Sequence, residues 1–287
     1  MNPLLELNSV SYAYHGKNGE TSALSDISFQ VFPEEFIAIV GPSGCGKSTL
    51  LSLISGLLSA ESGSISFQGT YSPPAGRGCP HPMKNRFAMR TAKNSRIGYM
   101  LQKDHLFEWR TIYRNITLGP EIRHCLDENT RKRIDSMLRE YGLDGFRNAR
   151  PSELSGGMRQ RAALIRTLAN DPELLLLDEP FSALDYQTRL NVCDDVAAIL
   201  RKERKTVLLV THDLSEAISM ADRIIVLTKR PARIQAVLEV HFSGDQLTPF
   251  ERRSAPEFSK YFHLLWKELN AGEKQENEDH KNEEPGN

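Results

Sequence analysis

The order of apolar and polar residues changes sharply within the first 60 positions. Residues 27–31 alternate between apolar and polar, which is typical of a half-buried strand. Residues 36–40 are all apolar, as expected for a strand buried on both faces. After Lys47 the apolar positions recur at helical spacing: they are 50, 51, 53, 54, 57 and 58. The pattern therefore predicts a strand, a glycine-rich loop and a helix, in that order.

The second half of the chain repeats this alternation of strands and helices. Two short apolar runs, 174–177 and 206–210, are typical of strands in a buried parallel sheet, and a helical stretch at 187–204 separates them. Further strands are predicted at 224–227 and 234–240. The chain is therefore predicted to have an α/β fold.

Two amphipathic helices are predicted outside this core. The first covers residues 127–141, and the second covers residues 256–270 within a C-terminal helical extension, 241–271. Residues 272–287 are polar and rich in charge, and they lack aromatic residues, so an acidic, disordered tail is predicted. The apolar faces are Ile134, Met137, Leu138 and Tyr141 in the first helix, and Phe258, Tyr261, Phe262, Leu265 and Leu269 in the second.

Composition excludes several classes of protein. The formal net charge of −1 gives no global basic field, so no nucleic-acid partner is expected. No stretch approaches the roughly 18 apolar residues of a membrane-spanning helix, and the first residues do not resemble a secretion signal, so a cytosolic chain is predicted. The four cysteines are scattered and are expected to be reduced thiols, and Cys79–His81 is too small a set for a metal site.

A basic, proline-rich insertion is predicted at about 70–95. No Asp or Glu occurs between Glu61 and Asp104. A solvated loop between two strands is the expected structure, and contact with anionic lipid or an acidic partner is the alternative.

The loop between the first buried strand and its helix fits the phosphate-binding pattern G-x-x-x-x-G-K-[ST]. Its backbone N–H groups are expected to surround phosphate oxygens, with help from the helix N-terminus. Lys47 would reach the β- and γ-phosphates, Ser48 would ligate Mg²⁺, and Thr49 would lie near the α-phosphate. The predicted nucleotide-binding residues here are Gly41, Pro42, Ser43, Gly44, Cys45, Gly46, Lys47, Ser48 and Thr49.

Two adjacent carboxylates follow the apolar run at 174–177. Asp178 is placed to hold Mg²⁺, directly or through water. Glu179 is placed to accept a proton from an attacking water and so to act as general base.

The order of these motifs resembles that of the ATP-binding subunits of ABC transporters. The resemblance covers about residues 4–240 and rests on the phosphate loop, Gln102, the run 154–160, Asp178-Glu179, 182–185 and His212. It implies a P-loop ABC cassette at 1–240, with a core parallel sheet, an antiparallel β subdomain and a helical subdomain at about 103–165. It also implies that two such subunits sandwich two ATP molecules head to tail.

The resemblance implies further roles. Ser155, Gly156 and Gly157 would meet the γ-phosphate held by the other subunit, and Asp185 would line the dimer seam. Gln102 would contact Mg²⁺ or the attacking water, and His212 would hydrogen-bond the γ-phosphate. ATP and Mg²⁺ are the implied ligands.

An adenine-stacking aromatic is also implied near the N-terminus. Tyr14 falls at the position that this family uses, and Tyr12 is the competing candidate. Stacking on a ring would add affinity more than base selectivity.

Three shorter sequence features resemble one branch of the importers in particular. Residues 101–111, Met158 and residues 229–234 are similar to the nitrate, sulfonate and taurine branch. The chain departs from the branch pattern at Glu108, where proline is common, and at Glu34, which replaces a usual glycine, and both departures fall in predicted loops.

The resemblance implies an ATPase that energises import of a small anionic solute such as nitrate or a sulfonate. The implied partners are a second copy of the chain, membrane-spanning permease subunits and, indirectly, an extracytoplasmic solute-binding protein. The implied location is peripheral, on the cytoplasmic face of the membrane. A soluble ABC-type ATPase without a permease is the alternative.

Overall fold

The structure is a computed structural model that describes residues 2–16, 19–68, 70–72, 96–244 and 247–282, and of 70–72 and 271–282 only the backbone. The chain forms two compact units, one from residues 1–82 and 209–287 and the other from residues 83–208. They are called the N/C unit and the middle unit below. Both contain strands and helices, so the predicted α/β class is confirmed.

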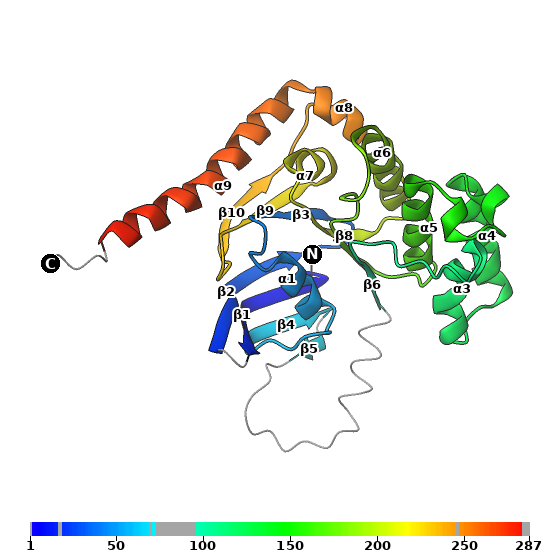
Figure 1. The fold of residues 1–287 in the computed structure, drawn as a ribbon, viewed down its shortest axis with the longest axis horizontal. Helices are drawn as coiled ribbons and strands as arrows, with labels where there is room; N and C mark the ends of the chain where they lie inside the picture. Colours follow the sequence, from blue (N-terminus) through cyan, green and yellow to red (C-terminus); the bar gives the residue numbers. More distant parts are fainter. Residues whose placement is uncertain (1, 17–18, 69, 73–95, 245–246, 283–287) are drawn as a thin grey trace, which may run out of the picture. The chain divides into compact units, whose positions relative to one another are not determined.

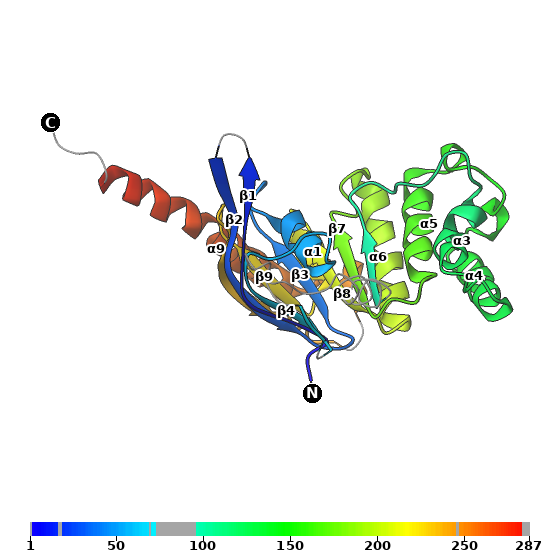
Figure 2. The same cartoon turned by 90° about the horizontal axis from the view of Figure 1, so that it is seen from below.

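The N/C unit contains a four-stranded antiparallel sheet in the order β2-β1-β4-β5 (Figure 1). Buried apolar residues face one another across β1 and β2, as in the pairs Leu5–Val31 and Leu7–Phe29. These two strands form a long twisted hairpin (Figure 2). The strands are β1 (Leu5–Gly16), β2 (Gly19–Val31), β4 (Ser62–Phe67) and β5 (Thr70–Ser72).

The same unit holds a second group of strands that carries the phosphate loop. The wholly buried β3 (Phe36–Val40) pairs in parallel with β9 (Arg223–Leu227), which pairs antiparallel with β10 (Ile234–Glu239). Glu34, in the turn before β3, has φ 65°. It therefore adopts the left-handed backbone conformation that favours glycine, the residue usual at this position in the resembling branch.

The predicted C-terminal extension is helical and packs on the N/C unit. Arg252 of α8 (Pro249–Ser254) is buried and donates to the carbonyl of Ala221 at 3.1 Å, next to the end of α7 (Leu214–Met220). In α9 (Pro256–Asn282) Leu265 is fully buried, and the rest of the predicted apolar face is half-buried. The helix continues to Asn282, into the segment from 272 that was predicted to be disordered. The Glu, Lys and Gln residues there have high helix propensity, and composition alone underrates this.

The middle unit combines two parallel strands with a group of helices. β6 (Ile97–Met100) pairs with β7 (Leu174–Asp178) in register, with Met100 opposite Leu177. The four residues of the face predicted for 127–141 are all buried. The helices are α3 (Ile112–Ile122), α4 (Glu128–Glu140), α5 (Gly156–Leu168) and α6 (Tyr186–Lys202), with short 3₁₀ turns η1 (Asp144–Phe146) and η2 (Pro151–Glu153).

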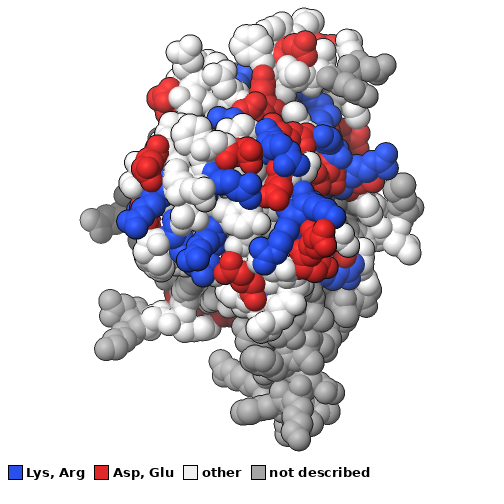
Figure 3. All heavy atoms as spheres, turned by 90° about the vertical axis from the view of Figure 1, so that its right-hand side faces the viewer, with Lys and Arg blue, Asp and Glu red and all other residues white. Residues whose placement is uncertain are grey.

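Basic and acidic side chains are interspersed on the face drawn in Figure 3. Several of the pairs in the middle unit are ion pairs, such as Arg147 with Asp135 at 2.7 Å and Lys132 with Glu128 at 2.8 Å. Such exposed pairs each contribute little to stability, about 0–1 kcal/mol.

None of the helices in the described ranges combines the length and apolar character that a membrane crossing needs. The predicted basic insertion at 70–95 lies largely outside the described residues, as do Cys79 and His81. The three cysteines that are described, Cys45, Cys125 and Cys193, form no disulfide.

Candidate functional site

The phosphate loop joins β3 to α1 (Lys47–Ile54) and has a shape that its glycines permit. Gly46 has φ 119° and Gly44 has φ 73°, both in the left-handed region. A Cβ on Gly41 would lie only 3.0 Å from the carbonyl oxygen of Leu227 and 3.1 Å from the Cys45 sulfur. A side chain at position 41 would therefore force the loop or Leu227 of β9 to shift by a few tenths of an ångström.

Lys47 is buried at the start of α1, and its ammonium group is held by the loop itself. Its Nζ donates to the carbonyl oxygens of Gly41 at 2.8 Å and Pro42 at 2.9 Å. The helix has no side-chain cap and no acidic residue in its first turn. Its first N–H groups and its positive dipole end are therefore suited to an anion.

The other loop residues differ in exposure. Ser43, Gly44 and Ser48 are exposed, whereas Thr49 and Cys45 are buried. Burial raises the pKa of the Cys45 thiol, against the opposing influence of the Lys47 charge. Cys45 is thus a neutral packing residue of the loop.

Tyr14 is joined to the phosphate-loop helix. Its hydroxyl lies 2.9 Å from the Thr49 hydroxyl, and its ring is 43% exposed. Tyr12 is half-buried and meets the Tyr14 ring edge-on, with centroids 5.0 Å apart. Of the two tyrosines, Tyr14 has the more accessible ring and the link to the loop.

His212 is exposed and follows β8 (Thr206–Val210), the strand in which the boundary between the units falls. The N–H of the preceding Thr211 donates to Ile39 of β3 at 3.2 Å. Asp213 caps α7 and accepts the N–H of Ser215 at 2.8 Å. The turn is thus fixed on both sides of His212 and lies beside the end of β3, where the phosphate loop begins.

In the middle unit, the two carboxylates and Gln102 gather at the carboxyl ends of β6 and β7. Asp178 is buried and accepts the Tyr99 hydroxyl at 3.3 Å. Glu179 Oε2 accepts the Gln102 amide at 3.3 Å. Glu179 also has φ 45°, which a non-glycine residue rarely adopts and which is typical of strained functional positions.

The run 154–160 forms the N-terminus of α5. Ser155 is the N-cap and accepts the N–H of Met158 at 3.4 Å. Gly157 is buried, and a Cβ there would lie 3.0 Å from Val192 and 3.1 Å from Thr188 of α6, while one on Gly156 would lie 3.1 Å from Leu184. The glycines therefore allow α5 to approach α6 closely.

Asp185 is the N-cap of α6, the helix that α5 approaches. Its carboxylate accepts the N–H of Thr188 at 3.0 Å, and this hydrogen bond lowers the pKa of Asp185 below its ordinary value. Asp185 is thus ionised and exposed at the N-terminus of α6.

Sequence reasoning missed the residues that tie α5 to the segment after Gln102. Arg159 Nε donates to the Asp104 carboxylate at 3.2 Å. Arg166 donates to the backbone carbonyls of Asp104 at 2.6 Å and His105 at 2.7 Å. The helical spacing of the two arginines, seven residues apart on one face, was the available signal.

The donor set predicted for a metal fits Mg²⁺. Asp178 offers a buried carboxylate, Gln102 an amide oxygen and Ser48 a hydroxyl. All three are hard oxygen donors, the ligand type that Mg²⁺ takes.

Residues 24–182, more than half of the chain, match the ABC transporter family. The chain belongs to the ABC transporter ATP-binding family. It is 42% identical to the uncharacterized ABC transporter ATP-binding protein YtlC of Bacillus subtilis, over 95% of this chain and 98% of that protein. It is 36% identical to the nitrate import ATP-binding protein NrtD of Synechocystis, over 96% and 98%, and 33% identical to the taurine import ATP-binding protein TauB of Roseobacter denitrificans, over 91% and 94%.

A solved structure agrees with this assignment. The dimeric structure of MJ0796, a bacterial ABC transporter cassette, has a TM-score of 0.68, with 28% identity over 83% of this chain and 99% of that one. The ABC cassette fold predicted from the motifs is therefore confirmed. The protein is an ABC ATPase of the branch that contains nitrate, taurine and sulfonate import proteins.

Proposed function

We propose that this ABC cassette is the ATP-binding and ATP-hydrolysing subunit that energises an importer. Lys47 and the backbone of the phosphate loop bind the phosphates of ATP, and Tyr14 stacks on adenine. Ser48, Asp178 and Gln102 hold Mg²⁺. Glu179 accepts the proton of the attacking water, and His212 donates to the γ-phosphate.

The contact between Glu179 and Gln102 carries this proposal. It joins a strained carboxylate to an amide that can orient water, at the carboxyl ends of two parallel strands. A general base of this kind contributes about 10²–10⁴-fold to a rate. A module that only binds nucleotide has no need of such a pair.

A second copy of the chain completes the proposed site. Ser155, Gly156 and Gly157 stand at the N-terminus of α5, which favours an anion, and they would meet the γ-phosphate bound by the partner copy. Asp185 would line the seam. The ATP-binding cassette MJ0796 forms a dimer in a post-hydrolysis state bound to ADP and Pi, which supports a dimer here.

The substitution Glu179→Gln tests this assignment. ATP turnover should fall about 100-fold or more while ATP binding persists, because only the proton acceptor is lost. The variant should elute as a dimer with ATP and as a monomer without it, by size exclusion with light scattering. Glu128→Gln, an exposed pair partner on α4, is the control and should behave as wild type. A Glu179→Gln protein that stays monomeric with ATP and turns over normally would contradict the proposal.

In this proposal, ATP hydrolysis drives a pair of membrane-spanning permease subunits. The cassette would then lie peripherally on the cytoplasmic face of the membrane. The nitrate, taurine and aliphatic sulfonate relatives support a small anionic solute, delivered by an extracytoplasmic solute-binding protein. Affinity purification from membranes should recover a multi-span protein with the cassette. Recovery of the cassette alone, with unchanged ATP turnover, would favour a soluble ABC-type ATPase instead.

A further inference from the structure

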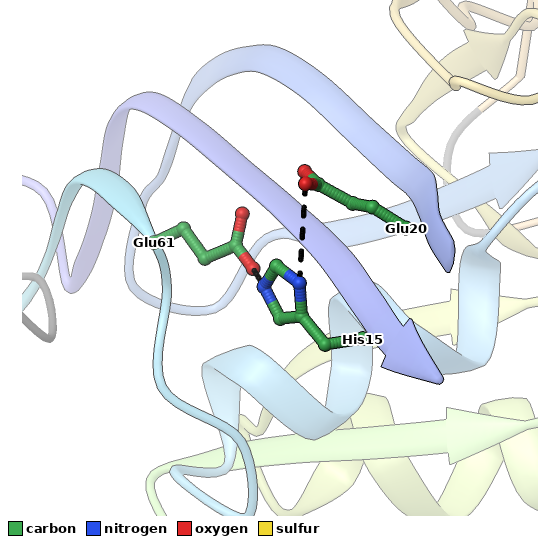
Figure 4. Close-up of side chains that lie close together, drawn as sticks. All are labelled: His15, Glu20 and Glu61. Carbon is green, nitrogen blue, oxygen red and sulfur yellow. Dashed lines mark hydrogen bonds and ion pairs between the residues drawn. The ribbon is translucent and has the colours of Figure 1, made fainter. Parts of the chain in front are cut away.

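A histidine and two glutamates converge at the exposed end of the β1–β2 hairpin (Figure 4). His15 Nε2 lies 2.7 Å from Glu61 Oε1, and His15 Nδ1 lies 3.9 Å from Glu20 Oε2. One ligand atom from each residue lies within 4.8 Å of the other two. The imidazole ring therefore stands between two carboxylates.

Three separate segments bring these side chains together. His15 of β1 is directly paired with Glu20 of β2, and Glu61 precedes β4 and donates its N–H to the carbonyl of Ser11 at 3.1 Å. The backbone positions are thus fixed by sheet hydrogen bonds. The side chains, in contrast, are exposed by 64%, 62% and 36%, and they are open to solutes.

Both glutamates of the cluster contact the same imidazole ring. Among the residues that the structure describes, neither glutamate forms an ion pair with a lysine or arginine. Two carboxylates therefore share one ring that can carry a single positive charge. Burial, the neighbouring Tyr14 and the Glu61 charge raise the pKa of Tyr12, which lies on the same strand as His15.

We propose that His15, Glu20 and Glu61 form a binding site for a divalent transition cation of the zinc type. One imidazole nitrogen and two carboxylate oxygens are a ligand set that suits Zn²⁺, with water in the fourth position. In a tetrahedral site the ligand atoms stand roughly 3.3–3.6 Å apart. Reaching this spacing around one ring nitrogen requires the Glu20 and Glu61 side chains to rotate, and both are exposed, by 62% and 36%.

This site is distinct from the proposed Mg²⁺ site of the ATPase. Its nitrogen ligand disfavours Mg²⁺, which takes oxygen ligands in near-octahedral geometry. It lies on the strand that carries Tyr14, so a bound cation would join β1, β2 and the segment before β4 next to the proposed adenine platform. The site does not depend on the proposed function, because no residue is shared.

Titration calorimetry of the full chain with zinc chloride, without nucleotide, tests the site. The background variant is Cys125→Ser, because an exposed thiol also binds zinc. One Zn²⁺ should bind per chain, and a large excess of Mg²⁺ should not displace it. His15→Ala and Glu61→Gln should each weaken binding at least about tenfold, since even indirect changes around a metal cost about 10–100-fold.

His241→Ala is the matched control. His241 is also exposed, and among the described residues its ring pairs with one carboxylate, that of Glu239 at 3.4 Å. Its loss should leave zinc affinity unchanged within about twofold. Circular dichroism checks that the variants fold, and NMR of the histidine rings should show His15 shifting on zinc addition.

Unchanged zinc affinity in His15→Ala, or an equal loss in His241→Ala, would overturn the proposal. A wild-type chain that binds no Zn²⁺ would also overturn it. A low ATP turnover in any of these variants would bear on the ATPase and not on zinc binding.

Discussion

In the N/C unit the phosphate loop is shaped by its backbone, whereas in the middle unit the candidate catalytic groups are side chains. The phosphate loop depends on glycines at 41, 44 and 46 and on carbonyls that receive Lys47. The middle unit instead places Glu179, Gln102, Ser155 and Asp185 at strand ends and helix caps. A backbone site is sensitive to an added Cβ, while a side-chain site is sensitive to a swap that barely changes shape.

The largest loss of ATP affinity is expected from Gly41→Ala in the N/C unit. The new Cβ would press on the Leu227 carbonyl and the Cys45 sulfur, so the loop must shift. Overpacking of this kind costs about 1–3 kcal/mol, so ATP affinity should fall up to about 100-fold. Gly145→Ala, where nothing lies within 4 Å of the new Cβ, is the control. Titration with a fluorescent nucleotide measures the affinity of both variants. Equal affinities would contradict the proposed dependence of the phosphate loop on its backbone.

A smaller and different effect is expected from Gln102→Ala in the middle unit. The variant lacks one hydrogen bond that orients the Glu179 carboxylate, so turnover should fall about tenfold or more while ATP affinity stays within about twofold. Gln30→Ala is the matched control, because Gln30 likewise donates to a half-buried glutamate, Glu6, at 2.8 Å. Loss of affinity in place of turnover would contradict the separation of roles between the two units.

Tyr14 allows the contributions of ring and hydroxyl to be separated. Tyr14→Leu removes the ring and should weaken ATP binding about tenfold, because a stacked base contributes about 1–3 kcal/mol. Tyr14→Phe loses only the contact with Thr49, worth about 1 kcal/mol, so a few-fold change is expected. Tyr12→Phe should have no effect on nucleotide affinity. A larger effect at Tyr12 than at Tyr14 would reverse the assignment.

The smallest effect concerns stability. Because the folded pKa of Asp185 is lowered by its cap to Thr188, the stabilisation is complete above the unfolded value near 4 and is lost as pH falls through the folded pKa. Asp185→Ala should lower Tm by a few degrees at pH 7 and by less at pH 3. Asp127, which caps α4 in the same way, offers a parallel measurement with Asp127→Ala. A Tm difference that grows in acid would be inconsistent with the ionised cap.

Elements with a clear periodicity could be predicted from the sequence. The helix 187–204 corresponds to α6, the run 174–177 to β7, and the face of Ile134, Met137 and Leu138 is buried in α4. The phosphate loop was predictable because its glycines and lysine are fixed by spacing. The family was confirmed by the comparisons, whereas the roles of single residues remain predictions.

Contacts between distant side chains could not be predicted. Tyr14 with Thr49, Asp178 with Tyr99, and the bonds from Arg159 and Arg166 to Asp104 and His105 depend on how elements pack. No local pattern encodes such pairs. The helix beyond residue 272 was missed for the opposite reason, because composition was weighed above local propensity.

The backbone of Glu179 has a consequence for how this position tolerates change. A left-handed conformation costs a non-glycine residue about 1–3 kcal/mol. Glu179→Gly would remove that cost and so raise the free energy of unfolding, but the variant would lack the proton acceptor. Selection for thermal stability alone should therefore enrich inactive variants at position 179, because catalytic activity and stability favour different residues there.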